Sequence, residues 1–389
     1  MPEEVLRKHK PRIQTLDALR GIAAVTVVIA HCSGNFQYPS FIDKSPLYFF
    51  KAAHEAVVFF FILSGYVLVY QYKSKSYFNY LEFFTARVFR IYIPYIASIG
   101  LSLLLYYLGA NFIDDTFFGS LWKSPVTSET IINHLILITN FDTNQLNHVI
   151  WSLVHEMRLS ILFPLILIAL SFKSVSYKII FVILCIASGI IIGKEILPSL
   201  GYLNSYIHTL YYFWLFVAGG LIVINQSSLV IKYSSLSSLT KVLLLTVAVI
   251  IYSYSHTIIY VFMKLPRLGL LEYSFIFEDF LTAIAASILI VSAIAVSKEK
   301  SILQHPLLLF FGKISYSLYL VHIPILAFFY KQLHSDLPVS IIILIGLPIA
   351  IFIAWIFNMI VERNSAKLGK KIGIKLSKAG SSLNYPIAT

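Results

Sequence analysis

The sequence predicts an all-α integral membrane protein of about ten transmembrane helices, with both termini in the cytoplasm. Of its 389 residues, 58% are hydrophobic and only 12% are charged. Ordinary soluble domains contain roughly 45–50% apolar and about 25% charged residues, so a soluble fold would expose too much apolar surface. Apolar runs of about 20 residues, the length that crosses the hydrocarbon core of a bilayer, recur along the chain.

The predicted spans follow one another without an intervening soluble domain. They cover residues 14–33, 53–72, 88–109, 150–171, 177–193, 206–225, 241–262, 277–297, 308–330 and 339–361. A shorter apolar run near 131–141 is expected to be a re-entrant or interfacial part of a long outer loop, about 110–149. We expect the membrane domain to comprise residues 1–363 and a basic cytoplasmic tail to comprise residues 364–389.

The orientation follows from the basic residues. With the N-terminus inside, the inner segments and the tail hold most of the 30 lysines and arginines, as is typical of cytoplasmic loops. These loops account for the net charge of +12, so nucleic acid is not expected as a partner. Cys32 and Cys185 lie in apolar runs and are too few for a disulfide framework or a zinc site. No bound metal and no cleaved signal peptide are expected.

Arg20 and His31 lie inside the first predicted span. Ionisable side chains there cost roughly 2.5–3.5 kcal/mol on insertion scales and usually mark a cavity or pathway. Their separation of eleven positions is three helical turns plus about 20°, so both lie on one face, roughly 16 Å apart. Taken singly, a snorkelling arginine and a hydrogen-bonded buried histidine would explain them. Together they suggest a polar path along the helix.

Other ionisable residues separate by depth into two layers. The outer layer contains His31, Glu156 and His322, with His54 and Glu55 nearby, and the inner layer contains Arg20, Arg87, Arg90 and Lys313. Histidines beside a carboxylate suit proton transfer, whereas clustered cations suit a phosphate-bearing ligand. Spacing alone fits either an anion transporter or an enzyme that takes a phosphorylated donor from the cytoplasm.

Six short motifs occur along the chain, between residues 16 and 363. They are Leu16–Gly21 leading to His31, Phe60–Tyr66, Arg87–Tyr92, Trp151–Glu156, Ile314–His322 and Val361–Arg363. In type and order they resemble the motifs of the acyltransferase-3 family of bacterial integral membrane acyltransferases. The sequence departs from that family's pattern at Asn364, where proline is common, and at Met157-Arg158, where many members carry a second acidic residue.

The resemblance implies transfer of an acyl group, commonly acetyl, from cytoplasmic acyl-coenzyme A to a hydroxyl of a surface glycan. O-antigen, exopolysaccharide or a lipid-linked glycan would be the acceptor, and the bacterial inner membrane the location. The long outer loop, about 110–149, is where we expect acceptor choice to reside. The alternatives are a transporter or flippase for an anionic or glycolipid substrate, and a membrane scaffold whose polar residues only hold helices together.

On this interpretation each candidate residue has a role. The phosphates of coenzyme A are expected on Arg20, with Arg87, Arg90 and Lys313 as further ligands. His31 is expected to act as general base or as transient acyl carrier, Glu156 to orient its ring, and His322 to steady the oxyanion. Ser64 and Gly65 are expected to serve helix packing, since small residues let helices approach closely.

Overall fold

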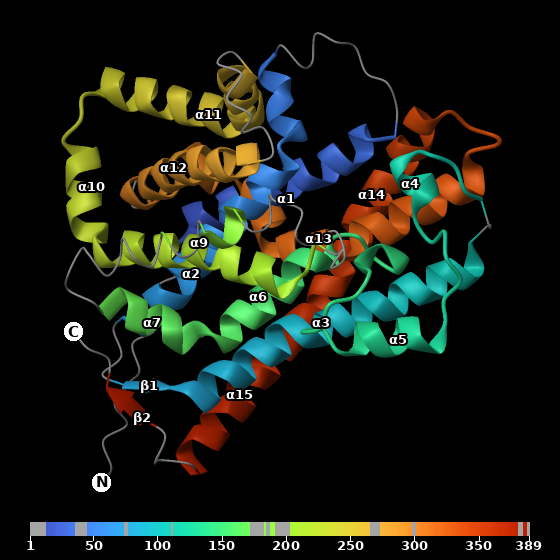
Figure 1. Cartoon of the computed structure of the whole chain (residues 1–389), viewed down its shortest axis with the longest axis horizontal. Helices are drawn as coiled ribbons and strands as arrows, with labels where there is room; N and C mark the ends of the chain where they lie inside the picture. Colours follow the sequence, from blue (N-terminus) through green and yellow to red (C-terminus); the bar gives the residue numbers. More distant parts are fainter. Residues whose placement is uncertain are drawn as a thin grey trace.

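The chain folds as a bundle of long helices joined by short helices and loops (Figure 1). The computed structural model describes residues 13–35, 45–73, 77–109, 112–171, 183, 187–190, 203–264, 273–297, 301–379 and 384–386. Within these ranges, eight helical segments are long and apolar enough to cross a membrane. They are α1 (Gln14–Ser33), α2 (Ala53–Tyr72), α3 (Tyr80–Leu108), α9 (Tyr206–Ile224), α11 (Ser238–Lys264), α12 (Ser274–Ala295), α13 (Pro306–Leu333) and the segment beginning with α14 (Val339–Phe357).

A ninth candidate span is broken. Helices α6 (Ile150–Ile161) and α7 (Phe163–Ser171) pass the length and composition test only together, and they are bent by 61° at their junction. The expected all-α membrane fold of about ten helices is confirmed in class, with eight or nine candidate spans in the described ranges. The span expected at 177–193 falls mostly outside the residues that the structure describes.

Two spans are longer than their hydropathy predicts. Helix α3 begins at Tyr80 rather than near 88, because the side chain of Asn79 accepts a hydrogen bond from the amide of Glu82 at 2.9 Å and caps its first turn. Helix α14 continues through a π-helical turn, η7 (Asn358–Glu362), into α15 (Arg363–Ala379). Polar residues in these extensions lower the mean hydropathy, so an apolar window does not detect them.

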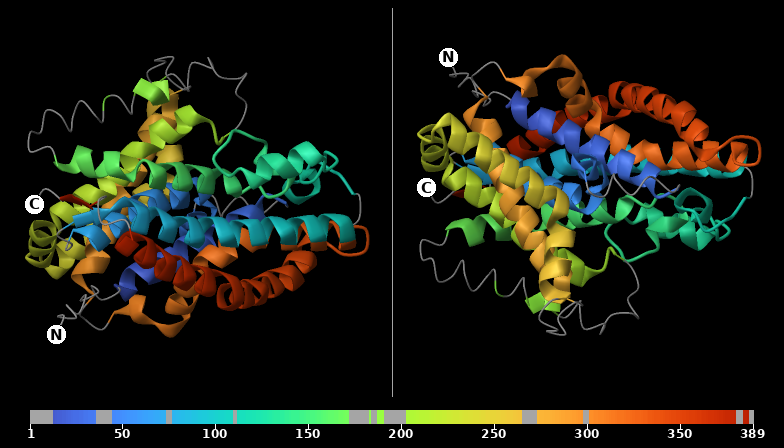
Figure 2. Two further views of the ribbon diagram at one scale, coloured as in Figure 1. Left: turned by 90° about the horizontal axis from the view of Figure 1, so that it is seen from below. Right: turned by 90° about the horizontal axis from the view of Figure 1, so that it is seen from above.

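Helix α15 packs along the first half of α3 (Figure 1; Figure 2, left). A Cβ atom placed on Gly369 would lie 2.3 Å from Cβ of Phe89, so the two helices are in close contact there. Beside them, strand β1 (Tyr77–Asn79) pairs antiparallel with β2 (Asn384–Pro386), with Phe78 opposite Tyr385. The basic helix α15 is thus held against α3.

Short elements occupy the connections. They are η2 (Pro46–Lys51), α4 (Phe117–Ser120), α5 (Ser128–Leu135), η3 (Thr143–Gln145), α10 (Gln226–Ser234) and η6 (Ile302–Gln304). Following the charge bias of the sequence, we call the end of the bundle that carries η2, α4, α5 and η3 the outer end. Helix α4 contacts α13, and it lies beside the α13–α14 end of the bundle in Figure 1.

Glycines bring two helix pairs into backbone contact. A Cβ atom on Gly21 of α1 would lie 2.5 Å from the amide nitrogen of Gly312 on α13, and one on Gly312 would lie 2.1 Å from the carbonyl oxygen of Asp17. Helices α2 and α9 meet in the same way, since a Cβ atom on Gly65 would lie 2.1 Å from the carbonyl oxygen of Phe216. Such contacts fix helix position closely, because no side chain separates the backbones.

Candidate active site

The close pairing of α1 with α13 joins two of the predicted site residues. His31 lies ten positions after Gly21, and His322 lies ten positions after Gly312. Because both helices rise about 1.5 Å per residue, equal steps from the glycine contact lead to the same level. There, Nδ1 of His31 lies 3.1 Å from Nε2 of His322. The structure therefore places the two histidines in direct hydrogen-bonding contact.

Hydrogen bonds around His322 indicate which ring nitrogens carry protons. Nδ1 of His322 lies 2.9 Å from the carbonyl oxygen of Leu318, and a carbonyl only accepts, so this nitrogen is protonated. His322 is fully buried and has no carboxylate partner in the described ranges, which favours a neutral ring. Its Nε2 then accepts a hydrogen bond from the protonated Nδ1 of His31. That arrangement leaves Nε2 of His31 with a free lone pair.

Two rings from the outer loop cover His31. Phe117 of α4 stacks on it with ring centroids 5.1 Å apart, and His148 lies edge-on at 5.9 Å. Nδ1 of His148 lies 2.5 Å from the side-chain oxygen of Asn144. Burial lowers the pKa of His148 below its ordinary value, while the negative charge of Asp142 acts in the opposite direction. A third neutral imidazole thus faces the histidine pair.

Sequence patterns did not single out His148. It lies in a loop, where neither helical nor strand periodicity assigns a direction to a side chain. The sequence feature that could have indicated His148 is its position two residues before the helix that carries the tryptophan-to-glutamate motif.

The sequence did not indicate Asn35 either, although this residue connects α1 to α4. Its side-chain nitrogen donates to the carbonyl of His31 at 2.7 Å, and its side-chain oxygen accepts from the backbone amide of Phe118 at 2.7 Å.

A line of polar side chains leads from the histidines toward the interior of the bundle. The ring of Tyr319 lies 6.2 Å from that of His322. Its hydroxyl is 2.7 Å from Oγ of Ser152, on α6. Glu156 follows Ser152 by one helical turn, so it lies roughly 6 Å further along α6. Polar side chains of α6 and α13 therefore lie between the level of the histidines and that of Glu156.

Glu156 does not reach His31. Its Oε1 accepts hydrogen bonds from Nη2 of Arg87 at 2.7 Å and from Oγ of Ser64 at 3.4 Å, while Nε of Arg87 donates to Oγ of Ser160 at 3.0 Å. The expected contact between Glu156 and His31 is therefore wrong. The reason is the position of Glu156 along α6, which places its carboxylate below the histidines and facing α3. His322 occupies the position beside His31 that was assigned to Glu156.

The four inner cations differ in their surroundings. Arg20 pairs with Asp17 at 3.0 Å, and Arg87 pairs with Glu156 at 2.7 Å. Arg90 and Lys313 are exposed, and neither forms an ion pair in the described ranges. Lys313 follows Gly312, which touches the backbone of Asp17, so it lies at the level of Arg20. The inner layer thus contains two paired and two exposed cations.

Tyr316 and Glu362 connect these cations to the last motif. Tyr316 donates to the carbonyl of Ile91 at 3.0 Å and lies within electrostatic range of Arg87, Arg90, Glu156 and Glu362. Oε2 of Glu362 accepts hydrogen bonds from Oγ of Ser317 at 2.6 Å and from the side-chain nitrogen Nδ2 of Asn358 at 2.8 Å. Glu362 belongs to the π-helical turn η7, and π-turns occur frequently at functional sites.

Arg158, whose role the sequence did not indicate, is a structural residue. It is buried and donates to the carbonyls of Ile138 at 2.9 Å and Asn204 at 2.6 Å, and to the side chain of Asn140 at 3.0 Å. It also lies over the ring of Tyr206 at 4.1 Å. Arg158 therefore fastens the outer loop and the start of α9 to α6.

A second polar cluster lies apart from the histidine pair. Nε2 of His54 is 2.6 Å from Oδ1 of the fully buried Asp279, whose Oδ2 accepts from the hydroxyl of Tyr211 at 2.8 Å. Glu55 accepts from Oγ of Ser255 at 3.1 Å. These contacts tie α2 to α9, α11 and α12. Within the described ranges, no three histidine, cysteine or carboxylate side chains are arranged to hold a metal ion.

Comparison with known proteins assigns the chain to a family. Searches among curated proteins and among solved structures returned no significant match. The family model described as "Acyltransferase domain" matches residues 13–359. That range includes the histidine pair, the Arg87–Glu156 ion pair and the exposed cations Arg90 and Lys313. The chain therefore belongs to the acyltransferase-3 family and is an integral membrane acyltransferase.

Proposed function

We propose that the chain transfers an acyl group from cytoplasmic acyl-coenzyme A to a hydroxyl of a cell-surface glycan, in the bacterial inner membrane. Acetyl is the simplest acyl group for this role, and O-antigen and exopolysaccharide are the acceptor classes we propose. The hydrogen bond between His31 and His322 is the observation that carries the proposal. It leaves one basic nitrogen, Nε2 of His31, without a partner in the described ranges.

His31 serves as general base in this proposal. Its Nε2 removes the proton from the acceptor hydroxyl while the hydroxyl oxygen attacks the thioester carbonyl. The carbon–sulfur bond then breaks, and the proton on Nε2 passes to the departing thiolate, so that the products are the acyl ester and free coenzyme A. His322 is a positioning residue, because its Nε2 accepts from Nδ1 of His31 and keeps the other ring nitrogen basic.

The inner cations support donor binding. Arg90 and Lys313 are exposed and have no ion-pair partner in the described part of the chain, so their charges remain available to phosphate groups. Arg20 lies at the level of Lys313 and shares its charge with Asp17. The pantetheine arm of the donor would follow the polar line along Tyr319 and Ser152 toward His31.

The test uses the purified full chain in nanodiscs with radiolabelled acetyl-coenzyme A and a panel of surface glycans. The proposal expects label on a glycan hydroxyl and release of free coenzyme A in equal amounts. If a substrate crosses the bilayer of reconstituted vesicles while the thioester stays intact, the chain transports rather than acylates, and the proposal is wrong.

A further inference from the structure

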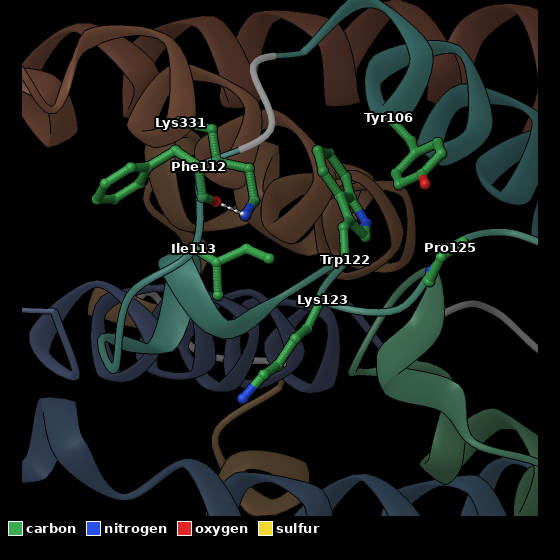
Figure 3. A pocket seen from close by; sticks show the side chains of 7 residues that line it. All are labelled: Tyr106, Phe112, Ile113, Trp122, Lys123, Pro125 and Lys331. Carbon is green, nitrogen blue, oxygen red and sulfur yellow. Dashed lines mark hydrogen bonds between the residues drawn. The ribbon is translucent and has the colours of Figure 1, made fainter.

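A cavity at the outer end of the bundle has a lining that the chemistry above does not use. Its volume is about 220 Å³, and Figure 3 shows the side chains around it. The lining comes from α3, from the segment 112–125 and from the end of α13: Tyr106, Phe112, Ile113, Trp122, Lys123, Pro125 and Lys331. Pockets for drug-sized ligands measure roughly 300–1,000 Å³, so this cavity has room only for a smaller group, such as a single sugar unit.

The charged side chains in this lining are both cations. Lys331 is 3% exposed, and its ammonium group donates to the carbonyl oxygens of Phe112 and Gly119, neither of which carries a negative charge. The nearby carboxylate of Asp114 accepts instead from Thr116 and from the hydroxyl of Tyr330, at 2.6 Å in each case. Lys123 is exposed at the rim. Both charged side chains that line the cavity are therefore positive, and the carboxylate of Asp114 acts on Lys331 from outside the lining.

Trp122 forms an aromatic wall in a strained backbone conformation. Its φ of 59° lies in the left-handed region that favours glycine. The indole nitrogen donates to the carbonyl of Leu146 at 3.1 Å, and the ring meets Tyr106 edge-on at 6.1 Å. Such strain persists where the surroundings over-determine a conformation, as they do at binding sites. A flat, fixed indole beside cations is a surface on which the C–H face of a sugar can pack.

The cavity and His31 share one short segment. Phe117 stacks on His31, and two residues later the carbonyl of Gly119 accepts from Lys331 at 3.1 Å. Asn35 fixes this segment to the end of α1 through the amide of Phe118. A ligand in the cavity would therefore lie beside the segment that packs on the ring of His31.

We propose that this cavity binds an anionic sugar residue of the acceptor glycan. The inference rests on the proposed function and names the substrate class for the same site. The acid group of the sugar forms charge-assisted contacts with Lys123 and Lys331, and its ring packs on Trp122. A sugar unit held in the cavity by its acid group would direct a hydroxyl of an adjoining unit of the glycan toward His31.

The experiment compares two acceptors that differ in one charge: an oligosaccharide containing glucuronic acid and its glucose counterpart. The full chain in nanodiscs is assayed with acetyl-coenzyme A as wild type, as Lys123→Glu and as the control Lys51→Glu. Lys51 is also basic and at the outer end but does not line the cavity. Lys123→Glu is expected to raise KM for the anionic acceptor by about tenfold and to leave KM for the neutral acceptor and the donor unchanged.

Equal responses of the two acceptors to Lys123→Glu, or an equal effect of Lys51→Glu, would overturn the proposal. Nanodiscs with and without anionic lipid separate a glycan charge from a lipid phosphate: an effect that appears only with anionic lipid also overturns it. Calorimetric binding of both oligosaccharides without donor distinguishes the two proposals. Charge-selective binding that Lys123→Glu abolishes, without any acyl transfer, would refute the proposed function alone, whereas equal binding of both would refute the sugar site.

Discussion

The rings of His31 and His322 are joined by a hydrogen bond of 3.1 Å between Nδ1 and Nε2. Each histidine stands ten residues beyond a glycine at which α1 and α13 touch. The carbonyl of Leu318 fixes the proton on the far nitrogen of His322, so the chain of hydrogen bonds ends at a free lone pair on His31. Helix packing near Gly21 and Gly312 thereby sets the chemistry of a ring roughly 15 Å away.

Replacement of His322 tests the proton arrangement. His322→Gln retains a carbonyl oxygen that can accept from Nδ1 of His31, whereas His322→Leu offers no acceptor. We expect His322→Leu to lower kcat about 100-fold, within the range that positioned acid–base groups contribute, and His322→Gln to lower it much less. KM for acyl-coenzyme A should not change in either variant. Steady-state kinetics on the purified variants provide the measurement. An equal loss of kcat in His322→Gln and His322→Leu would contradict the proposed hydrogen bond from His31 to His322.

Gly312→Ala tests the register of α1 and α13. The added methyl group would lie 2.1 Å from the carbonyl oxygen of Asp17, and a backbone atom cannot move aside locally. We expect a loss of about 1–3 kcal/mol in the free energy of unfolding, seen as a lower melting temperature in detergent, together with loss of acyl transfer.

Gly100→Ala is the matched control, because nothing lies within 4 Å of a Cβ atom at that position of α3. Alanine favours a helix over glycine by up to about 1 kcal/mol, so this variant should melt at or above the wild-type temperature. If Gly312→Ala behaved in the same way, the two helices would not be in backbone contact.

Arg87 and Arg90 lie one turn apart on α3, but their replacement by alanine is predicted to have different effects. Arg87→Ala leaves Glu156 without its partner at 2.7 Å, and the Glu156 side chain is 22% exposed. We therefore expect a loss below the cost of breaking a fully buried ion pair, which is about 3–5 kcal/mol. The double variant Arg87→Ala/Glu156→Ala should recover part of that loss. Arg90→Ala should leave unfolding within about 0.5 kcal/mol of wild type and raise KM for acyl-coenzyme A. Unchanged KM in Arg90→Ala would remove Arg90 from the donor site.

The loop histidine His148 is predicted to make stability fall with acidity. Because burial lowers its pKa below the ordinary value of 6.5, the unfolded chain binds a proton there that the folded chain does not bind. The free energy of unfolding therefore decreases as pH falls below about 6.5, by at most about 1.4 kcal/mol per pH unit. His148→Gln should show a shallower decrease between pH 7 and pH 5. Parallel melting curves for the two proteins would refute this assignment.

Residue patterns predicted the membrane class, most span positions and the shared face of Arg20 and His31, because hydropathy and the 3.6-residue period act within one helix. They did not predict that His31 meets His322 or that Glu156 meets Arg87. Those contacts depend on the rotation and depth of separate helices, and the Gly21–Gly312 contact sets them for the histidine pair. His148 and Trp122 lie in loops, where no periodicity assigns a direction.

The most direct measurement of the central claim is a single-turnover reaction of wild type and His31→Ala with radiolabelled acetyl-coenzyme A and an acceptor glycan. We expect His31→Ala to bind the donor with wild-type affinity, since we propose that the donor phosphates bind at the inner cations. We also expect this variant to transfer label at least about 100-fold more slowly. Transfer at the wild-type rate by His31→Ala would contradict the account, because the lone pair on His31 would then have no part in the reaction.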